Sequence, residues 1–486
     1  MSKIVILGAG IAGHTAATHL RRKLGNEHEI LVVSPNSNYQ WVPSNIWVGI
    51  GRMSPNDVKF PLAPLYKKHH IGYKQAKVIS FHPEGDVKNA KPYVIAEYVF
   101  GDNKGKHEII DYDFLINATG PKLAFDLTEG LNPGTNKCYS VCSYDHAEHA
   151  SAAFTNLKLK LKKSTEKVKI LIGTGHAKAT CQGAAFEYIL NVDSELRRCG
   201  LREKAEITWI SNEYHLGDFG MDGMLLTYGD MIMKSSDMVE MVFEDREIKW
   251  ILGAGVNKIE NGIAHYENLD GEYKTETFDF AMLIPAFSGH GFKAYDKHGA
   301  DITEKLFRGF MIVDADYSAK PYEEWTVQDW PETYQNPSYP NIFAPGIAFA
   351  PPHSISKPRK SPNGTEIFPA PPRTGMPSGI TAKLVAENII ESIKKGEIIT
   401  PHRGSLGNMG AACVASSGFG FTKGSAVTIT TFPIVPDYIK YKNSGGRDLK
   451  KTFGEIGLGG HWVKYSLHFA FLWKAKMKPF WFMIPE

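Results

Sequence analysis

Short apolar runs alternate with longer helical stretches in the first part of the chain. Residues 4–7 form the first run, residues 14–24 have a helical pattern, and residues 30–33 form a second apolar run. Continuous apolar runs of this length are typical of strands that are buried on both faces of a parallel sheet. The order predicts a buried strand, a helix and a parallel strand, starting almost at residue 1.

A glycine turn joins the first strand to its helix. Gly8, Gly10 and Gly13 have the spacing that allows a tight turn, a close backbone approach and close packing of helix on strand. Such a turn places the helix N-terminus where it can bind a pyrophosphate. The second strand ends in Ser34, where NAD-binding units have an acidic residue, so the pattern favours FAD over a generic NAD site.

Two later strands return the chain to this first domain. An apolar strand at residues 113–117 ends in Ala118-Thr119-Gly120, and another at 341–345 ends in Gly346. A helix opens near Arg373-Thr374-Gly375 and runs from about 378 to 394, and its N-terminus is expected to face the flavin. These patterns are similar to those of FAD-dependent enzymes of the disulfide-reductase type.

The middle of the chain repeats the arrangement in a weaker form. A strand at 168–172 leads into Gly173 and Gly175, but Lys178 stands where the third glycine is needed. We therefore expect a second, degenerate nucleotide-binding domain that binds NADH poorly. A Pro-rich segment follows later, between 351 and 372, and it is interpreted as a solvated loop rather than a functional lid.

These patterns predict an α/β fold with two Rossmann-like dinucleotide-binding domains and a C-terminal membrane-associating helical region. The expected segments are 1–125 (first part of the FAD domain), 126–330 (the degenerate domain), 331–400 (the return to the FAD domain) and 401–486 (quinone and membrane region).

The tail from 461 to 486 differs from the rest because aromatic side chains alternate with lysines. This composition suits the bilayer interface, where rings lie at headgroup depth and lysines reach the phosphates. A helix that packs on the core or at an oligomer interface is the alternative interpretation. No stretch approaches the ~20 apolar residues that span a bilayer, and no signal peptide is visible.

Composition and charge narrow the choice of partners. The net charge of +3 is too small to indicate nucleic-acid binding. Five cysteines in 486 residues do not suggest a disulfide framework, and no spacing indicates a metal site. Cys142, Cys181 and Cys413 each lie beside a predicted turn, and Cys181 near a helix start is expected to have a lowered pKa.

Four stretches together resemble sulfide:quinone oxidoreductase, over nearly the whole chain. They are residues 39–49, 118–123 and 284–289, and the Cys181-Gln182-Gly183-Ala184-Ala185-Phe186-Glu187 run. The Ser at the end of the second strand and the non-acidic Ile347 after Gly346 also match that family. The segment near 353–370 and the longer C-terminal end depart from it.

The resemblance implies roles for particular residues. Cys181 and Cys413 would flank the flavin and hold a growing sulfur chain, with Cys142 as a third cysteine. His146 and Glu187 would handle protons. The implied quinone-side residues are Lys464 and Phe419, and the implied FAD-binding residues are Gly8, Gly10, Gly13, Ser34, Pro43, Asn45, Ala118, Thr119, Gly120, Gly346, Thr374 and Gly375.

The implied activity is FAD-dependent oxidation of sulfide to polysulfide or elemental sulfur, with reduction of a membrane quinone. The implied protein is a peripheral homo-oligomer on the cytoplasmic membrane of a prokaryote. Three alternatives remain: a type II NADH:quinone dehydrogenase, the flavoprotein subunit of a flavocytochrome c sulfide dehydrogenase, and a non-enzymatic flavin sensor. Lys178 and the cysteines count against the first, the tail against the second, and the absence of an effector domain against the third.

Overall fold

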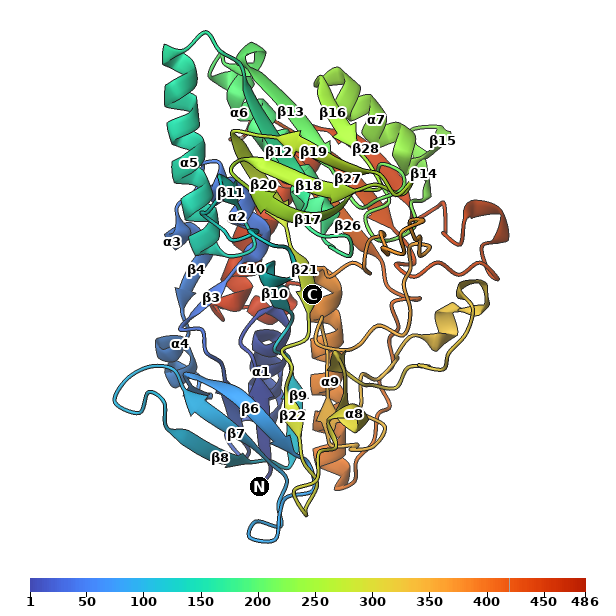
Figure 1. Cartoon of the computed structure of the whole chain (residues 1–486). Coiled ribbons are helices and arrows are strands. Elements are labelled where there is room, and N and C mark those ends of the chain that lie inside the picture. The colour runs from blue at the N-terminus through green and yellow to red at the C-terminus, as the bar shows by residue number, and fades with distance from the viewer. Residues whose placement is uncertain (419) are drawn as a thin grey trace.

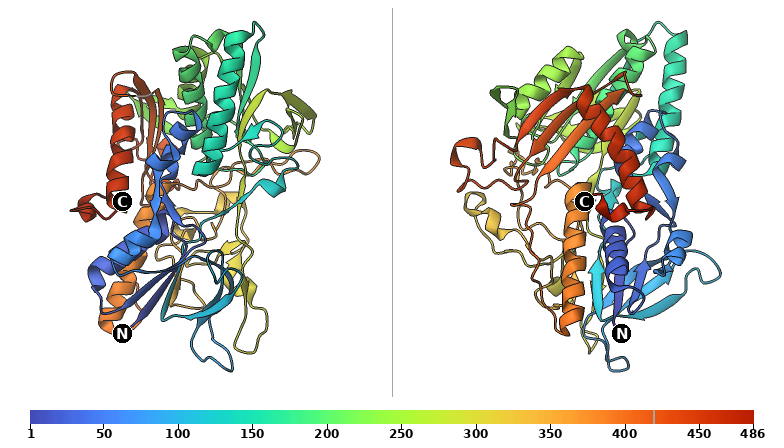
Figure 2. Two further views of the ribbon diagram at one scale, coloured as in Figure 1. Left: turned by 90° about the vertical axis from the view of Figure 1, so that its left-hand side faces the viewer. Right: turned by 180° about the vertical axis from the view of Figure 1, so that it is seen from behind.

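The computed structural model describes residues 1–418 and 420–486, and two parallel sheets form its main layers (Figure 1). The first sheet has the order β25-β9-β1-β2-β5 and is parallel throughout. Its strands are Ile342–Phe343, Phe114–Asn117, Lys3–Leu7, Glu29–Val33 and Gly72–Lys74 in that order. Helices α1 (Ile11–Leu24) and α9 (Gly375–Lys395) run side by side against it (Figure 2).

The second parallel sheet lies above the first in the view of Figure 1 and has the order β11-β20-β12-β13-β16. Its strands are Cys138–Tyr139, Phe280–Ile284, Val168–Thr174, Ala205–Ile210 and Ile248–Ile251. Helices α5 (Tyr144–Lys163), α6 (Gln182–Arg198) and α7 (Ser235–Asp245) pack around it. Two Rossmann-like units are therefore present, as the alternating pattern predicts.

A third sheet joins the C-terminal segment to the second unit. Its order is β15-β14-β28-β27-β26, with bounds Met231–Lys234, Leu225–Tyr228, Phe453–Gly457, Gly424–Thr431 and Ala411–Gly418. Helix α10 (Leu458–Ala475) crosses one face of this sheet, as the right-hand view of Figure 2 shows. The C-terminal segment thus shares its sheet with a hairpin that lies more than 170 residues earlier, which the sequence does not predict.

Smaller elements complete the fold. A three-stranded meander consists of β17 (Gly255–Glu260), β18 (Ile263–Glu267) and β19 (Tyr273–Thr277). A four-stranded sheet has the order β22 (Lys293–Ala294), β6 (Ala76–His82), β7 (Tyr93–Tyr98) and β8 (His107–Asp111). Short pairs are formed by β3 (Asn38–Gln40) with β4 (Lys59–Pro61), β10 (Lys122–Ala124) with β21 (Ala286–Ser288), and β23 (Phe307–Arg308) with β24 (Phe310–Met311). The short helices are α2 (Asn45–Gly49), α3 (Pro55–Val58), α4 (Leu62–Lys68) and α8 (Thr303–Leu306).

The predicted strands are confirmed where the apolar runs are continuous, because those residues fill the centre of each sheet. Ile4 to Leu7 of β1 are fully buried, and so is every residue of β20. Helix α9 begins at Gly375, three residues before its predicted start.

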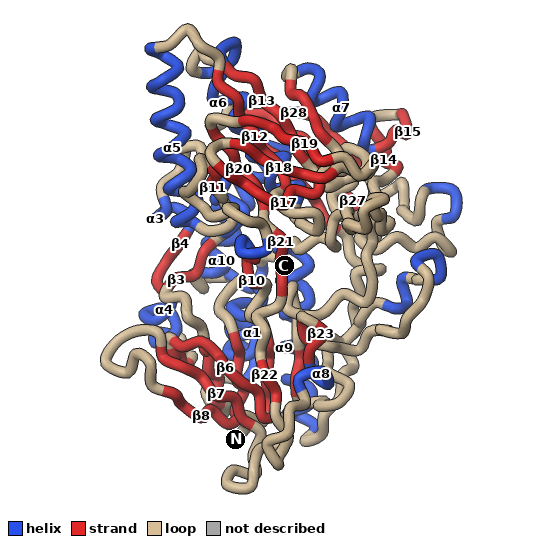
Figure 3. The backbone as a smooth tube through the Cα atoms, viewed as in Figure 1, coloured by secondary structure: helices blue, strands red, loops and turns tan. Residues whose placement is uncertain are grey.

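Long stretches between β24 and α9 are loop (Figure 3), and the interpretation of 351–372 as a solvated loop is right only in part, because some of its residues are exposed and others are buried. Ile355 and Ile367 are buried, and the Ser361 hydroxyl is hydrogen-bonded to the buried Glu267. The segment lies against the second unit because its few apolar side chains find partners there, which composition alone does not reveal.

Candidate active site

Helix α6 begins beside Cys181, the residue that caps its N-terminus. Cys181 has a positive φ of 68°, and its thiol donates to the backbone oxygen of Arg373 with a sulfur–oxygen distance of 3.6 Å. A left-handed conformation is unusual for a residue with a side chain and is typical of functional sites. The chain therefore holds this thiol in one defined orientation at the end of the helix.

Cys413 meets the first turn of the same helix from the opposite side. It lies on β26, and a Cβ atom added to Gly183 would stand 2.9 Å from its sulfur. Helix α6 and strand β26 thus pack so closely that only glycine fits at this point. The fold brings the two predicted sulfur-chain cysteines, 232 positions apart in the sequence, to one end of one helix.

Cys142 is the third thiol near this place. It precedes α5, its backbone N–H is bonded to Ser140 Oγ at 3.1 Å, and its charge acts on the pKa of Cys181. The remaining two cysteines stand apart: Cys138 is buried in β11, and Cys199 ends α6.

The prediction of a lowered pKa for Cys181 is wrong. Burial, with a smaller contribution from Cys142, raises the pKa of the Cys181 thiol to about 12, although Arg373 counteracts part of the effect. Burial also raises the pKa of Cys413 and of Cys142 to about 11. Desolvation disfavours the thiolate more than the neighbouring positive charge and donors favour it, so these thiols are protonated at neutral pH.

Glu187 and Lys464 form a buried ion pair next to Cys413. Lys464 Nζ on α10 lies 2.9 Å from Glu187 Oε2 on α6, and the two side chains are 13% and 7% exposed. Burial raises the pKa of Glu187, although Lys464 counteracts the effect, and the charges of both side chains act on the pKa of Cys413. The other carboxylate oxygen of Glu187 has no hydrogen-bond partner.

His146 lies in the first turn of α5, one turn after Cys142. Its ring meets Phe125 edge-on with centroids 5.6 Å apart, and its buried Nδ1 has no hydrogen-bond partner. Burial lowers the pKa of His146. In the described part of the chain, His146 and Glu187 form no hydrogen bond or ion pair with each other.

The glycine turn before α1 fits a dinucleotide pyrophosphate. A Cβ at Gly8 or Gly13 would overlap backbone oxygen atoms, whereas a Cβ at Gly10 would meet nothing within 4 Å. Gly10 caps α1 and is exposed, and no side chain is bonded to the helix N-terminus. The open turn and the free N–H groups are those that a phosphate requires.

The other predicted FAD-binding residues lie around this turn. Ser34 ends β2 and is buried, and Ala118-Thr119-Gly120 follow the adjacent strand β9. Helix α9 opens at Gly375, beside Ile11 of α1, with Thr374 as a cap that makes no side-chain bond, and Gly346 packs on Ala12.

Pro43 and Asn45, two further predicted FAD-binding residues, lie at the start of α2: Pro43 is in the turn that precedes this helix, and Asn45 is its first residue. Asn45 is fully buried, and while its Nδ2 donates to Val141 O, its Oδ1 has no partner. A buried acceptor without a partner is consistent with a polar ligand bound at this point. Phe419, the other predicted quinone-side residue, lies outside the described residues.

The second glycine turn, after β12, is covered by the chain itself. Phe368 N and Ala370 N donate to Ala177 O and Ala179 O, and Lys178 is ion-paired with Glu366. Glu213, which follows β13 where an NAD site has its ribose-binding acid, is fully buried, and burial raises its pKa to about 8. Residues 366–370 therefore pack against the segment that follows this turn.

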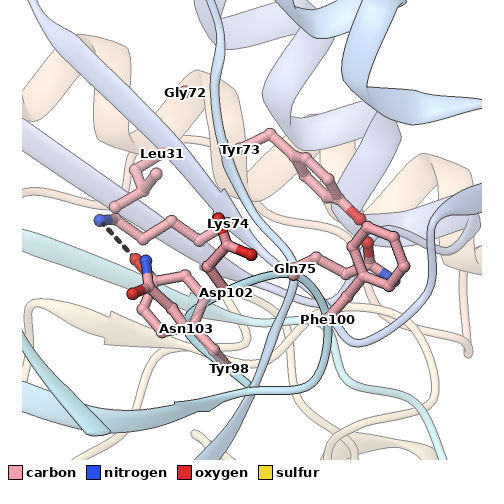
Figure 4. Close-up of a pocket in the computed structure, with 10 residues that line it drawn as sticks. Leu31, Gly72, Tyr73, Lys74, Gln75, Tyr98, Phe100, Asp102 and Asn103 are labelled. Atoms are coloured by element: carbon pink, nitrogen blue, oxygen red, sulfur yellow. Dashed lines mark hydrogen bonds between the residues drawn. The ribbon is translucent and has the colours of Figure 1, made fainter. Parts of the chain in front are cut away.

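A surface pocket of about 530 Å³ lies elsewhere, at the edge strand β5, and Figure 4 shows its lining. Lys74 bonds Tyr98 there, with the interaction dashed in the figure, and is ion-paired with Glu108. None of the predicted site residues lines this pocket. Within residues 1–418 and 420–486 no group of His, Cys, Asp or Glu is arranged to hold a metal ion.

Sequence reasoning missed several residues around the thiols. Asn191, Ser416 and His461 form a buried hydrogen-bonded group between α6, β26 and α10. Asn191 follows Glu187 by one helical turn, so a search of the inward face of α6 would have found it. The partnership of Ser416 with His461 depends on tertiary packing and leaves no sequence signal.

The chain is similar in sequence and in fold to known proteins. A family model described as pyridine nucleotide-disulphide oxidoreductase matches residues 2–187. The sulfide-quinone reductase of Aquifex aeolicus is 27% identical over 478 residues, which are 97% of this chain and 91% of that protein. The X-ray structure of the sulfide:quinone oxidoreductase from that bacterium superposes with a TM-score of 0.74, covering 98% of this chain and 92% of that one.

The resemblance to sulfide:quinone oxidoreductase is confirmed. A mitochondrial sulfide:quinone oxidoreductase of Dictyostelium discoideum is 26% identical over 60% of this chain and 57% of that protein. The structure of NDH2 from Plasmodium falciparum in complex with NADH has a TM-score of 0.62 at 13% identity and covers 98% of this chain and 96% of that one, which shows a common fold alone.

Gly183→Ala tests the packing that brings the cysteines together. The new methyl group would stand 2.9 Å from Cys413 Sγ, so the sulfur or the strand must shift. We expect a loss of about 1–3 kcal/mol in unfolding free energy, as for other overpacked positions, and a changed alkylation rate of Cys413. Thermal unfolding and mass spectrometry of alkylated peptides measure the two effects.

Gly459→Ala in α10 is the matched control, because its Cβ would make only an ordinary contact at 3.6 Å. Equal stability and equal Cys413 reactivity in the two variants would contradict the described packing.

Proposed function

We propose that the protein is an FAD-dependent sulfide:quinone oxidoreductase, which oxidises sulfide to polysulfide or elemental sulfur and reduces a membrane quinone. The observation that carries this proposal is the meeting of Cys181 and Cys413 at the N-terminus of α6, in a chain similar to sulfide-quinone reductase over 97% of its length. A non-enzymatic flavin sensor has no need for a pair of thiols there.

The cofactor part of the proposal is supported by the two helix ends that meet near Gly10 and Gly375. Both α1 and α9 begin without a side-chain cap, so their N–H groups are free for the phosphates and the flavin ring. A bound FAD would supply two-electron redox chemistry next to the thiols. We assign FAD rather than FMN because the turn at Gly8, Gly10 and Gly13 is that of a dinucleotide site.

The two cysteines, Cys181 and Cys413, carry the proposed sulfur chemistry. In the oxidised pair, hydrosulfide attacks one cysteine sulfur, a new S–S bond forms, the bond between Cys181 and Cys413 breaks, and the other cysteine leaves as a thiolate. This exchange is redox-neutral. When the new persulfide and the released thiolate join in a trisulfide, one proton and two electrons are released, and a bound FAD would be the acceptor of those electrons. Because burial raises both thiol pKa values, the released thiolate is a strong base, and a proton acceptor and donor must lie nearby.

The Glu187–Lys464 pair is suited to that task and to the quinone. It connects α6, which carries Cys181, to α10, and it lies beside Cys413. A buried lysine and a carboxylate that exchange one proton between them can deliver it to a quinone oxygen. This arrangement supports a quinone site between α10 and the third sheet.

The outward side of α10 and the segment after it support a peripheral membrane site. Exposed apolar side chains gather there: Trp462, Val463, Leu467, Phe469, Trp473, Phe480, Phe482 and Met483. Among the described residues, no helix is both long and apolar enough to span a bilayer. A quinone could enter from the lipid directly beneath Lys464.

An NADH:quinone dehydrogenase is the second candidate, because NDH2 of Plasmodium falciparum has the same fold. Residues 366–370 count against it, since their hydrogen bonds to Ala177 and Ala179 hold them beside the second glycine turn. The flavocytochrome c type is disfavoured by the exposed aromatic surface of α10.

Cys181→Ser and Cys413→Ser test the sulfur chemistry. Each variant should bind FAD but lose sulfide-dependent bleaching of the flavin by at least about 100-fold, because a hydroxyl neither forms a disulfide nor replaces a thiolate nucleophile. Stopped-flow absorbance under anaerobic conditions measures the rate. Cys199→Ser, at the far end of α6, is the control and should keep the wild-type rate. Full turnover in both test variants would rule out the assignment.

Val463→Gln combined with Phe469→Gln tests the membrane surface. Both side chains are about half exposed on α10. Their loss should weaken binding to phosphatidylglycerol-containing vesicles by about tenfold, equivalent to ~1.4 kcal/mol. Sedimentation with vesicles measures the bound fraction. Ile109→Gln with Tyr273→Gln removes exposed apolar groups from other strands and should change nothing; equal weakening in both pairs would mean that α10 is not the contact.

A further inference from the structure

A small cavity lies at the start of helix α9, with Arg373 in its wall. Its volume is about 20 Å³, which is enough for one water-sized ligand. No residue of the glycine turn at 8–13 lines it, so it is separate from the pyrophosphate cradle. Most of the lining side chains are apolar, among them Trp330, Phe349, Pro371, Leu406 and Ile434.

Among the described residues that line the cavity, Arg373 alone carries a charge. Its Nη1 makes two long hydrogen bonds, of 3.4 Å to Ile347 O and 3.3 Å to Phe349 O. Its guanidinium carbon also lies over the ring of Phe310, 4.5 Å from the centroid. Two carbonyl groups and a ring face orient the guanidinium, but none of them carries a negative charge that would neutralise it.

No carboxylate balances this charge. In the described part of the chain no Asp or Glu acts on the pKa of Arg373, which responds only to Cys181 and Tyr317 among its charged neighbours. Burial lowers the pKa of Arg373 to about 10, so the side chain is still cationic at neutral pH. Buried charges are normally paired, and an unpaired guanidinium in a cavity wall is suited to an anionic ligand.

The cavity adjoins one of the two thiols of the proposed reaction. Cys181 Sγ lies 3.6 Å from Arg373 O, so the residue that lines the cavity also contacts Cys181. The charge of Arg373 acts on the pKa of Cys181 as well. The function proposed above does not use the Arg373 side chain.

The substrate of the proposed reaction has the properties that this cavity selects. Hydrosulfide is a monovalent anion with a single heavy atom, so it matches the small volume and the single positive charge. Its sulfur accepts hydrogen bonds from a guanidinium and tolerates the apolar walls. Anions with several oxygen atoms, such as phosphate or sulfate, are larger than the volume allows.

We propose that Arg373 and this cavity form a binding subsite for hydrosulfide, which holds the anion beside Cys181 before it attacks the pair of cysteines. The guanidinium N–H groups donate to the sulfur, and no covalent bond forms or breaks at this point. The subsite raises the concentration of the nucleophile next to the thiols. This inference rests on the proposed oxidation of sulfide.

Arg373→Gln removes the charge, and Arg373→Lys restores it without the planar guanidinium. Anaerobic stopped flow measures flavin reduction in the FAD-loaded proteins over a range of sulfide concentrations. In Arg373→Gln the half-saturating sulfide concentration should rise by about 10- to 100-fold, as for the loss of a charge-assisted hydrogen bond, with a limiting rate within about threefold of wild type. Arg373→Lys should recover most of the affinity.

Arg308→Gln is the matched control, because Arg308 is exposed on β23, bonds Tyr317 O and does not line the cavity. It should keep the wild-type dependence on sulfide. An unchanged half-saturating concentration in Arg373→Gln would overturn the subsite. A loss confined to the limiting rate, together with a shifted flavin reduction potential, would also overturn it, because Arg373 would then act on the flavin.

Bromide probes the cavity without sulfide, because it is a monoatomic anion that cannot reduce the flavin. Crystals of the FAD-loaded wild-type protein soaked in sodium bromide should show a bromine anomalous signal within hydrogen-bonding distance of Arg373. In solution, bromide should compete with sulfide in the wild type and not in Arg373→Gln.

No bromine signal at Arg373 would overturn the subsite, whether or not the variants fold. A signal without competition would mean an adventitious ion only, and the subsite would be rejected. Because the crystal experiment needs no sulfide, a failure of the proposed sulfide oxidation would be seen separately, as a wild-type flavin that sulfide does not reduce.

Discussion

The close packing of helix α6 on strand β26 is the contact on which the rest of this structure depends. At Gly183 the two elements approach so closely that the sulfur of Cys413 takes the place of a side chain. The same helix is fixed at its other end by the fully buried Asp193, which pairs with Arg202 and Arg246. A helix held rigidly at both ends presents Cys181, Glu187 and Asn191 to the C-terminal sheet with little freedom.

Burial governs the chemistry of this interface. Each thiol has a raised pKa because water is excluded, and burial also raises the pKa of Glu187, although its ion pair with Lys464 counteracts the effect. Such a site does not rely on thiolates that are already formed. The proposed chemistry relies on proton transfer at the moment of reaction, and the Glu187–Lys464 pair between α6 and α10 is suited to serve it.

The sequence predicts those parts of the molecule that depend on local patterns. Apolar runs identify β1, β9, β12 and β20, and the glycines before α1 identify the cofactor cradle, because only glycine allows those close backbone contacts. The three cysteines were found through family resemblance. The sequence could not show that Cys413 reaches Gly183, since that contact depends on a sheet shared by distant segments.

One expectation was wrong and another was right only in part, for the same reason. The pKa of Cys181 and the solvation of residues 351–372 were both inferred from local features, namely a helix start and a Pro-rich composition. Tertiary burial outweighed the helix N-terminus at Cys181 and placed Ile355 and Ile367 in the interior. The sequence also does not show that Lys178 is ion-paired with Glu366, or that residues 368 and 370 are hydrogen-bonded beside it, because these contacts come from a distant segment.

The most direct test of the account is the anaerobic absorbance of the flavin in the purified protein, mixed in parallel with sulfide and with NADH. The account predicts that sulfide bleaches the flavin, that a short-chain quinone then restores it, and that NADH has no effect. Bleaching by NADH and not by sulfide would contradict the account, because the protein would then be an NADH dehydrogenase in which the thiols at the end of α6 take no part in the reaction.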